Sequence, residues 1–412
     1  MVMDCKSDGI SKYNGAVVVI PTRNRAQIAM NAIRSVLDQR VDGVDVMVSD
    51  NSTSESDREQ LAEFCAALNN SRVRYVRPPQ ALAMTAHWQW VIDQALALYD
   101  ASHFTYLTDR MMFKTGAVEE VFKFAALYPH KVISYNHDRI VDHVRPIRIE
   151  FYPSTGKLWE VPSQRLSWLV SQGVLHHGLP RMLNCIVPRL VVNRFRERFG
   201  NVFASIAPDF NFCFRCLDIE DSILFFDKSP IFHYALDRSN GASVTRGEMT
   251  PDNADFTANL PVDGAIRNYA TAIPQLNTAV NAVFNEYLIH KQETGSQRYF
   301  DLDFQKYLRA NALEITEMSD PHRREEMHNL LAQHGYRGVE NDGTQGTVGS
   351  WITRARSIVR ILKTPTRLQP EVGVEFERLD DAINYARNSS HTTPQSPAAV
   401  REILQASDLP LQ

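Results

Sequence analysis

Three short polar clusters in the first 110 residues carry side chains of the kinds that bind ligands. They are Pro-Thr-Arg-Asn-Arg at 21–25, Asp-Asn-Ser at 50–52 and Thr-Asp-Arg at 108–110. Carboxylates and hydroxyls exchange hydrogen bonds with a ligand, and guanidinium groups bind phosphates through two parallel hydrogen bonds. Any one cluster would also fit a turn or a helix cap. If the fold brings all three together, a ligand-binding site is the better interpretation.

The segments around these clusters predict elements that would bring them together. Each cluster directly follows a short apolar run, which is typical of a strand buried on both faces of a parallel sheet. Helical periodicity separates the runs and predicts right-handed crossovers in a doubly wound sheet. Ligands bind outside the carboxyl ends of such strands, where all three clusters would lie. The predicted strands are 16–20, 45–49, 73–76, 103–107 and 131–135, and the predicted helices are 27–39, 55–68 and 85–98.

The composition is that of a globular protein that needs no disulfide or metal to hold its fold. The chain has 412 residues, 44% of them hydrophobic, enough for two domains or one large domain with additions. A net charge of -4 argues against a general nucleic-acid binder. The N-terminus lacks a signal peptide and no apolar run could span a bilayer, so we expect a cytoplasmic protein. The five cysteines are expected to be reduced thiols.

The order and spacing of the motifs resemble those of the family 2 glycosyltransferases, which have the GT-A fold. The resemblance rests on AVVVIPTRNRAQIAMNAIRSVLDQ from residue 16, VDVMVSDNSTSES from residue 44 and HFTYLTDRMMF from residue 103. It covers about the first 250 residues. It implies an α/β domain with a mostly parallel, Rossmann-like sheet flanked by helices, which binds a nucleotide sugar. A mainly helical C-terminal region is expected to follow.

The resemblance also assigns nucleotide-binding residues. The loop that begins with Pro21 would hold the nucleotide, with Thr22, Asn24 and Arg25 lining the site. Asp50 would accept a hydrogen bond from the base, which suits the N3–H group of uracil or thymine. Further residues in segments that usually approach the nucleotide or sugar are Arg74, His87 and, for the ribose, Asp109.

The third motif departs from the family pattern at Arg110, where a metal-binding aspartate is expected. An arginine cannot ligate a cation, but it can itself neutralise a departing diphosphate. Three alternatives stay open. Asp109 holds Mg²⁺ or Mn²⁺ while phosphates and water supply most of the other ligands, with His233 as a candidate further ligand; Arg110 replaces the metal as a catalytic residue; or the site is degenerate and inactive. A lone histidine such as His233 is more often structural.

Two further residues receive roles from the resemblance. Asp209 follows a Gly-x-x-Phe turn at 200–203 and would be the general base that deprotonates the acceptor hydroxyl. The alternative is that Asp209 only stabilises the first turn of a helix over 208–217. Arg238, beside a Ser-Asn-Gly turn, could close over the diphosphate as a lid. The Cys-x-x-Cys pair at 213–216 has no second pair nearby and predicts core packing.

The rest of the chain is predicted in coarser terms. We expect a glycosyltransferase domain over 1–250, with a nucleotide-binding half at 1–135 and an acceptor half at 136–250. The stretch 161–188 reads as loop-rich, a helix is expected over 190–199, and 251–340 reads as a helical extension. The last part, 341–412, reads as a linker, a basic amphipathic helix over 351–363 and a polar tail. That helix, with Arg367 beyond it, could lie on an anionic membrane or dock on protein.

These features favour an inverting glycosyltransferase of bacterial polysaccharide biosynthesis. It would move a sugar from a UDP or dTDP donor to a hydroxyl of a glycan or a lipid-linked acceptor. The position would be cytoplasmic, with a peripheral place at the inner face of the plasma membrane. The second hypothesis is a catalytically degenerate sugar-nucleotide-binding or scaffold protein, supported only by Arg110. A nucleotidyltransferase would have a glycine-rich loop after the first strand, and 21–25 contains no glycine.

Overall fold

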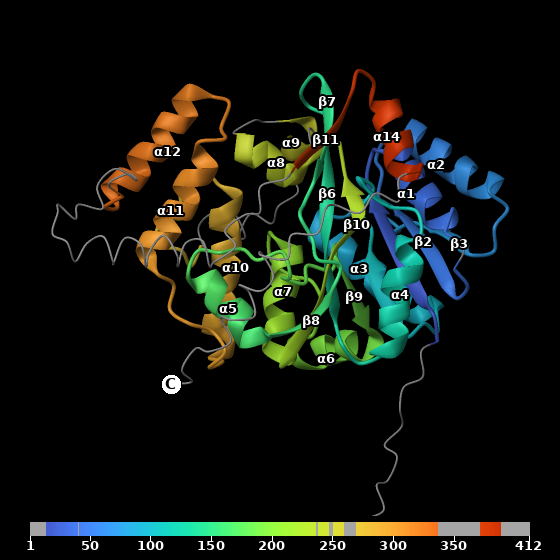
Figure 1. Ribbon diagram of the computed structural model, residues 1–412, viewed down its shortest axis with the longest axis horizontal. Helices are drawn as coiled ribbons and strands as arrows, with labels where there is room; N and C mark the ends of the chain where they lie inside the picture. The colour runs from blue at the N-terminus through green and yellow to red at the C-terminus, as the bar shows by residue number, and fades with distance from the viewer. Residues whose placement is uncertain are drawn as a thin grey trace, which may run out of the picture.

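The computed structural model describes residues 14–39, 41–235, 238–246, 250–258, 269–336 and 371–388. Within these residues, eleven strands join in one sheet with helices on both sides (Figure 1). The strands are β1 (Ala16–Thr22), β2 (Val44–Asp50), β3 (Val73–Val76), β4 (His103–Tyr106), β5 (Met111–Phe113), β6 (Ile133–Val141), β7 (Ile147–Phe151), β8 (Leu158–Pro162), β9 (Cys185–Pro188), β10 (Ser222–His233) and β11 (Glu371–Phe376).

The helices fall into two groups along the chain. Those between the strands are α1 (Ala26–Leu37), α2 (Glu55–Ala67), α3 (Met84–Leu98), α4 (Ala117–Leu127), α5 (Ser163–Ser171), α6 (Arg189–Phe199) and α7 (Pro208–Ile219). Those after β10 are α8 (Asn240–Arg246), α9 (Pro251–Ala258), α10 (Ala279–Thr294), α11 (Phe304–Ile315), α12 (Pro321–Gln333) and α14 (Leu379–Asn388).

The N-terminal half of the sheet is parallel and buried on both faces. β1 lies between β2 and β4, and β3 lies beyond β2, all in parallel register. Successive side chains of a strand point to opposite faces. Val17 and Val19 therefore pack with α3, α6 and α7, whereas Val18 and Ile20 pack with α1, α2 and α4. This alternation explains why the strand is apolar throughout, and it confirms the predicted α/β fold class.

The sheet becomes mixed beyond β4. β9 is inserted between β4 and β6 and runs antiparallel to both of them. β10 then pairs in parallel with β6 and antiparallel with β5 and β8. The prediction of an extended parallel sheet therefore holds for the first four strands and not for the second half. The predicted strand at 131–135 is the start of the longer β6.

The prediction of a loop-rich stretch over 161–188 was wrong in part. This stretch contains the end of β8, the whole of α5 and the strand β9. α5 is short, but it buries Leu166, Leu169 and Val170 on one face, so packing against the sheet stabilises it beyond its own propensity. β9 has only four residues, too few for a periodic pattern to stand out.

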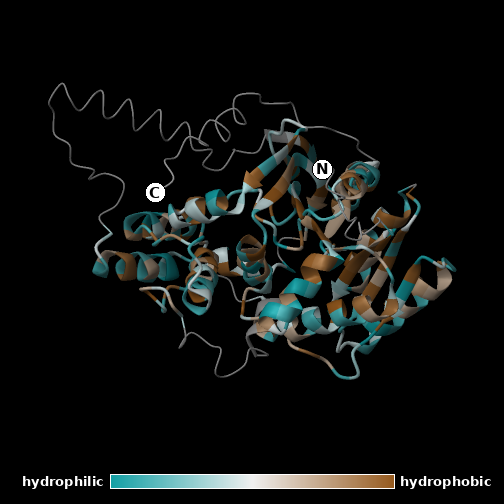
Figure 2. Cartoon of the chain, turned by 90° about the horizontal axis from the view of Figure 1, so that it is seen from below, coloured by the Kyte–Doolittle hydropathy of each residue, from teal (hydrophilic) through white to brown (hydrophobic). Residues whose placement is uncertain are grey.

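A helical layer covers the side of the sheet away from α1 and α2. In Figure 1 the orange helices α10, α11 and α12 lie on the opposite side of the molecule from the blue helices. α10 packs on α7, where the rings of Tyr287 and Phe214 meet edge to face at 5.4 Å between centroids. Figure 2 shows brown, apolar strands inside and helices with teal faces around them. The described part of the predicted helical extension at 251–340 contains α9, α10, α11 and α12, with 259–268 and 337–340 outside the described residues.

Two elements near the C-terminus were not predicted. β11 pairs antiparallel with β7, and α14 follows it onto the same end of the sheet (Figure 1). The alternating sequence EVGVEF suits an edge strand, but only the position of β7 gives it a partner. The predicted basic helix at 351–363 lies outside the described residues. Among the helices that are described, none is long and apolar enough to cross a membrane.

Candidate functional site

The first two polar clusters meet at the carboxyl ends of β1 and β2. Thr22 and Asp50 are paired residues in the parallel ladder, and the Asn51 amide donates to the Thr22 carbonyl at 2.9 Å. Asn24 has a positive φ of 54°, and its side-chain oxygen accepts from the backbone amides of Thr53 and Ser54 at 2.8 and 2.9 Å. Asn24 thereby fastens the first loop to the second, so its side chain is engaged with protein rather than with a ligand.

The third cluster joins them through Asp109. One carboxylate oxygen of Asp109 accepts from the Thr22 hydroxyl at 2.9 Å, and the other lies 3.4 Å from an Arg25 nitrogen. The side chain of Asp109 is almost fully buried. The structure therefore brings residues of all three clusters together, and Asp109 anchors the β4 loop to the β1 loop.

Asp50 is the most enclosed acid of the group. It has no exposed surface, and its oxygens accept from the Ser52 amide at 2.8 Å and from the Tyr75 hydroxyl at 2.7 Å. Burial and the bond to Asp50 raise the pKa of Tyr75, which therefore stays a protonated donor. The partly exposed Arg77 lies 3.9 Å from Asp50.

His87 and Arg74 do not face this group in the described structure. His87 is buried in the first turn of α3, and its Nε2 atom lies 2.8 Å from the Ser49 hydroxyl. Burial lowers the pKa of His87 to about 3, so the ring is neutral. The Arg74 guanidinium lies over the ring of Tyr99, 5.4 Å from its centroid. In the described structure, both side chains therefore contact other protein side chains, His87 that of Ser49 and Arg74 that of Tyr99.

Arg110 is bonded to His233 at the end of β10. The Arg110 Nη1 atom lies 2.8 Å from His233 Nε2, and because arginine only donates, Nε2 is the acceptor. Burial and the Arg110 charge lower the pKa of His233, which agrees with a neutral ring. The ring of His137 lies 5.8 Å from that of His233. An arginine and two histidines therefore form one basic group beside Asp109.

The described residues at this position do not form an ion site from protein ligands alone. The Nε2 lone pair of His233 is used by Arg110, and Asp109 is engaged by Thr22 and Arg25. Among the residues that the structure describes, no three His, Cys, Asp or Glu side chains are placed to hold one metal ion. The alternative in which Asp109 and His233 share Mg²⁺ or Mn²⁺ therefore lacks a ligand set here.

Asp209 lies at the second position of α7, directly after Pro208. Pro208 has the fixed φ that suits the first helical position, and the helix N-terminus attracts a carboxylate. Burial raises the pKa of Asp209, although the nearby positive charge of Arg181 opposes the rise. A carboxylate with a raised pKa accepts a proton more readily than an exposed one. The charge of Arg181 also lowers the pKa of His233, so Arg181 acts electrostatically on both Asp209 and His233.

Arg238 follows β10 and closes on the first loop. Its carbonyl accepts from an Arg25 nitrogen at 2.8 Å, and its guanidinium donates to the Asn24 carbonyl at 3.3 Å. The turn that contains Ser239 leads directly into α8. The segment predicted to form a lid thus already contacts the loop that is expected to hold the nucleotide.

Two residues of this site were missed in the sequence. Tyr75 lies on β3, and only the register of β2 and β3 brings it to Asp50. Arg181 lies in the stretch that was predicted to be loop-rich, and nothing in its local sequence marks it.

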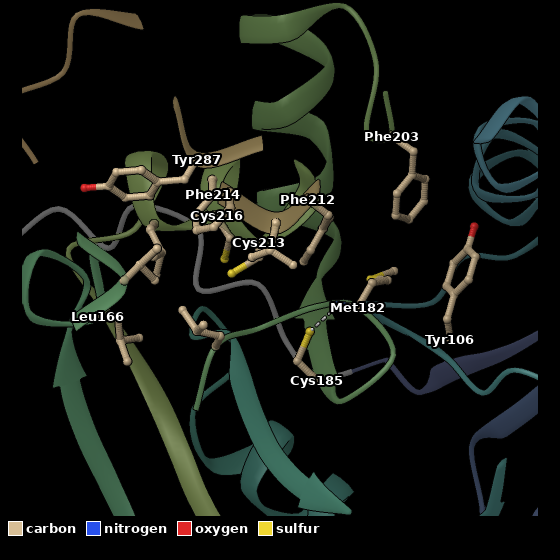
Figure 3. Close-up of a cluster of buried hydrophobic side chains, with 14 of the residues drawn as sticks. Tyr106, Leu166, Met182, Cys185, Phe203, Phe212, Cys213, Phe214, Cys216 and Tyr287 are labelled. Atoms are coloured by element: carbon tan, nitrogen blue, oxygen red, sulfur yellow. Dashed lines mark hydrogen bonds between the residues drawn. The ribbon is translucent and has the colours of Figure 1, made fainter. Parts of the chain in front are cut away.

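Figure 3 shows the Cys-x-x-Cys pair inside the core beside Phe214, and both thiols are buried and free. The predicted core packing of Cys213 and Cys216 agrees with this position.

Comparisons with known proteins point to one family. Residues 17–168 match the model of "Glycosyl transferase family 2", a shorter stretch than the 250 residues expected from the motifs. The fold is similar to that of S. aureus TarS residues 1–349 in complex with UDP-GlcNAc, with 13% identity, a TM-score of 0.43 and coverage of 76% of this chain and 83% of that one. For the structure described as S. aureus TarS, the identity is 12% and the TM-score is 0.41. The match covers 81% of this chain and 56% of that chain. No curated protein matches.

Proposed function

We propose that this protein is a glycosyltransferase with the donor, acceptor class and reaction given below, and the match of residues 17–168 to the model of "Glycosyl transferase family 2" supports the proposal. The donor is a nucleoside-diphosphate sugar of the UDP or dTDP type. The acceptor is a hydroxyl of a glycan or of a lipid-linked glycan in polysaccharide synthesis. The sugar is transferred with inversion at its anomeric carbon. The observation that carries the proposal is the joining of the β1, β2 and β4 loops through Thr22, Asn24 and Asp109.

The nucleotide end is assigned to the β1 and β2 loops. The side chain of Asp50 accepts hydrogen bonds from the Tyr75 hydroxyl and the Ser52 amide, and it accepts the N3–H of uracil or thymine once Arg77 moves aside. Cytosine has a bare acceptor nitrogen at that position, so it would face the carboxylate with no proton between them. With cytosine bound, the buried side chain of Asp50 would lack the hydrogen bond that uracil or thymine provides, and such a loss discriminates strongly between two ligands.

The diphosphate end is assigned to the basic group. Arg110 carries a fixed positive charge in a partly buried position beside Asp109, and His233 holds its guanidinium. As the bond between the anomeric carbon and the phosphate oxygen breaks, negative charge grows on the leaving nucleoside diphosphate. A preorganised guanidinium stabilises that charge through two parallel hydrogen bonds. Arg110 thus takes over the neutralising role that a metal ion has in related enzymes.

The acceptor end is assigned to Asp209. The acceptor hydroxyl oxygen attacks the anomeric carbon on the face opposite the diphosphate, and Asp209 takes the hydroxyl proton. One bond forms between the acceptor oxygen and that carbon, one bond to the phosphate oxygen breaks, and the electron pair leaves with the diphosphate. Asp209 is partly buried in the first turn of α7, and this burial raises the pKa of the carboxyl, which supports the role.

A nucleotide panel in a thermal-shift experiment tests the donor assignment. A ligand that binds the native state raises the melting temperature of the protein. UDP and dTDP should therefore raise it without added metal, whereas CDP and GDP should not. Asp50→Asn should remove the preference for UDP over CDP, since an amide can both accept and donate. Arg77→Ala serves as the matched control and should retain the preference. A panel in which CDP or GDP binds best would contradict the assignment.

The segment 351–367 is proposed to bind an anionic membrane surface. Its sequence combines one tryptophan and an apolar stripe with several basic residues. Each basic residue near an anionic surface contributes about 1 kcal/mol, so replacing both Arg356 and Arg360 by Glu should reduce binding to vesicles rich in anionic lipid by at least about tenfold. Co-sedimentation measures this, with Lys123→Glu plus Arg309→Glu as the charge-matched control. Equal pelleting of both variants would refute the proposal.

A further inference from the structure

A carboxylate of the helical extension lies buried beneath the loop that precedes Asp209. Glu286 lies on α10 and has no exposed surface. Its oxygens accept hydrogen bonds from the Ser205 hydroxyl, from the Ala207 amide at 3.4 Å and from the Asn211 side chain at 3.2 Å. The hydrogen bonds that Glu286 accepts all come from neutral donors of the segment around α7, so the arrangement of these donors depends on Glu286.

The three donors lie on both sides of Asp209 in the chain. Ala207 is the residue before α7 and has no side chain that could cap the helix, and Asn211 lies in the first turn. Negative charge near a helix N-terminus is stabilising, and here it comes from a different element. Glu286 therefore fixes both the start of α7 and the direction in which its first turn leaves the loop, and Asp209 is carried on that turn.

The loop is held from its other side by α3. The Ser205 carbonyl accepts from the Thr85 hydroxyl at 2.7 Å, and the side chain of Gln89 accepts from the Val202 and Phe203 amides at 2.7 and 3.0 Å. Ser205 has a φ of 65°, a conformation that a residue with a side chain adopts only when its surroundings hold it. The loop is thus fastened between the nucleotide-binding half, through α3, and the extension, through α10.

Charged and titratable groups also surround Glu286. Burial and, to a smaller extent, the negative charge of Asp209 raise the pKa of Glu286 to about 7, although the hydrogen bonds from Ser205, Asn211 and Ala207 oppose the rise. The other groups that face Glu286 are Arg215 on α7 and Tyr269 before α10, and Arg181 faces Asp209. Glu286 and Asp209 are therefore coupled electrically as well as through the hydrogen-bonded loop.

We propose that Glu286 is a positioning residue for glycosyl transfer, which holds Asp209 in place to deprotonate the acceptor through Ser205, Ala207 and Asn211. This inference rests on the proposed role of Asp209 as the base. It gives the helical extension a function in the reaction, because α10 supplies the group on which the catalytic loop is built. Glu286 itself touches neither donor nor acceptor.

The test compares two buried carboxylates of the extension. Glu314 on α11 accepts from the Ala279 and Val280 amides and from the Thr245 hydroxyl, far along the chain from the Asp209 loop, so Glu314→Gln is the matched control. The full-length Glu286→Gln variant should release UDP from a UDP-sugar with a kcat about 10- to 100-fold lower, while the KM for the donor stays within about twofold. Glu314→Gln should keep kcat within about twofold of the wild type.

The pH profile separates positioning from a loss of stability. Burial raises the pKa of Glu286 to about 7, so the part of the acid limb of kcat/KM that reports protonation of Glu286 near that pH should be absent from Glu286→Gln and present in Glu314→Gln. An acid limb and a kcat equal to those of the control would overturn the inference.

If Glu286→Gln does not fold, Ser205→Ala provides a second test, because it removes one of the donors to Glu286 at an exposed position. This variant should also have a lower kcat than the wild type, and an unchanged kcat would overturn the inference. Normal turnover by an Asp209 variant would instead refute the proposed base.

Discussion

Replacing Asp209 by asparagine is expected to lower kcat for sugar transfer by about 10²- to 10⁴-fold, the usual contribution of a positioned general base. The amide keeps the size of the side chain but cannot take the acceptor proton. Donor binding should be unchanged, because the nucleotide contacts lie on the β1 and β2 loops. UDP release measures turnover, and the thermal shift with UDP measures binding. Asp221→Asn, an exposed acid just after the same helix, is the control and should behave like the wild type.

The pH dependence of the wild type gives the same prediction in another form. Burial raises the pKa of Asp209 above its ordinary value, and the base works only when it is deprotonated. Activity should therefore fall as the pH falls through this raised pKa, at a higher pH than for an exposed aspartate. An Asp209→Asn variant with near-normal turnover, or an acid limb at the value of an exposed aspartate, would rule out Asp209 as a buried base.

Replacing Arg110 by alanine is expected to cost about 10²- to 10³-fold in kcat, comparable to removing one preorganised donor from a charge-stabilising site. Lysine at this position restores the charge but not the planar pair of donors, so Arg110→Lys should recover only part of the activity. Arg58→Ala, on the outer helix α2, is the control for the loss of one arginine. Steady-state UDP release measures all three variants.

The wild type should keep its activity in an excess of EDTA, since the described residues offer no ligand set for an ion and Arg110 already supplies the charge. Loss of activity on chelation, with recovery on adding Mn²⁺, would contradict the role proposed for Arg110. Together, the Arg110 variants and the chelation experiment distinguish a site with an arginine in place of a metal from an inactive one.

The part of the fold that could be predicted is the part with local, repetitive signals. The first five residues of β1 are apolar on both faces because both faces are covered, and this produces a run that no exposed strand would have. Thr22 and Asp50 are the last residues of β1 and β2, and Asp109 follows β4, so their meeting follows from the order of these strands. Chain order and handedness therefore placed three loops together before any contact was known.

The contacts made by particular side chains could not be predicted in this way. Asn24 was expected to face a nucleotide, but its left-handed backbone turns its amide back onto Thr53 and Ser54. His87 was expected to approach the donor, but it lies on the buried face of α3 against Ser49. Glu286 carries no sequence signal, because a glutamate in a helix is ordinary until the tertiary fold closes over it.

The C-terminal contribution to the sheet was missed for the same reason. β11 is six residues long and is separated by more than 200 residues from its partner β7. An edge strand of that length gains its stability from the ladder and from cross-strand contacts, which are decided by the partner and not by the strand itself. Non-local pairing of this kind leaves little trace in the local pattern.

The most direct test of inverting transfer by this site is the anomeric form of the sugar that the enzyme releases when water replaces the acceptor. Purified full-length protein, an α-linked UDP-sugar and excess EDTA would be followed by proton NMR from the first turnovers, before the free sugar equilibrates. The β-anomer should appear first together with UDP, and Asp209→Asn should produce neither. Initial release of the α-anomer, or no release of UDP by the wild type with or without Mn²⁺, would contradict the account.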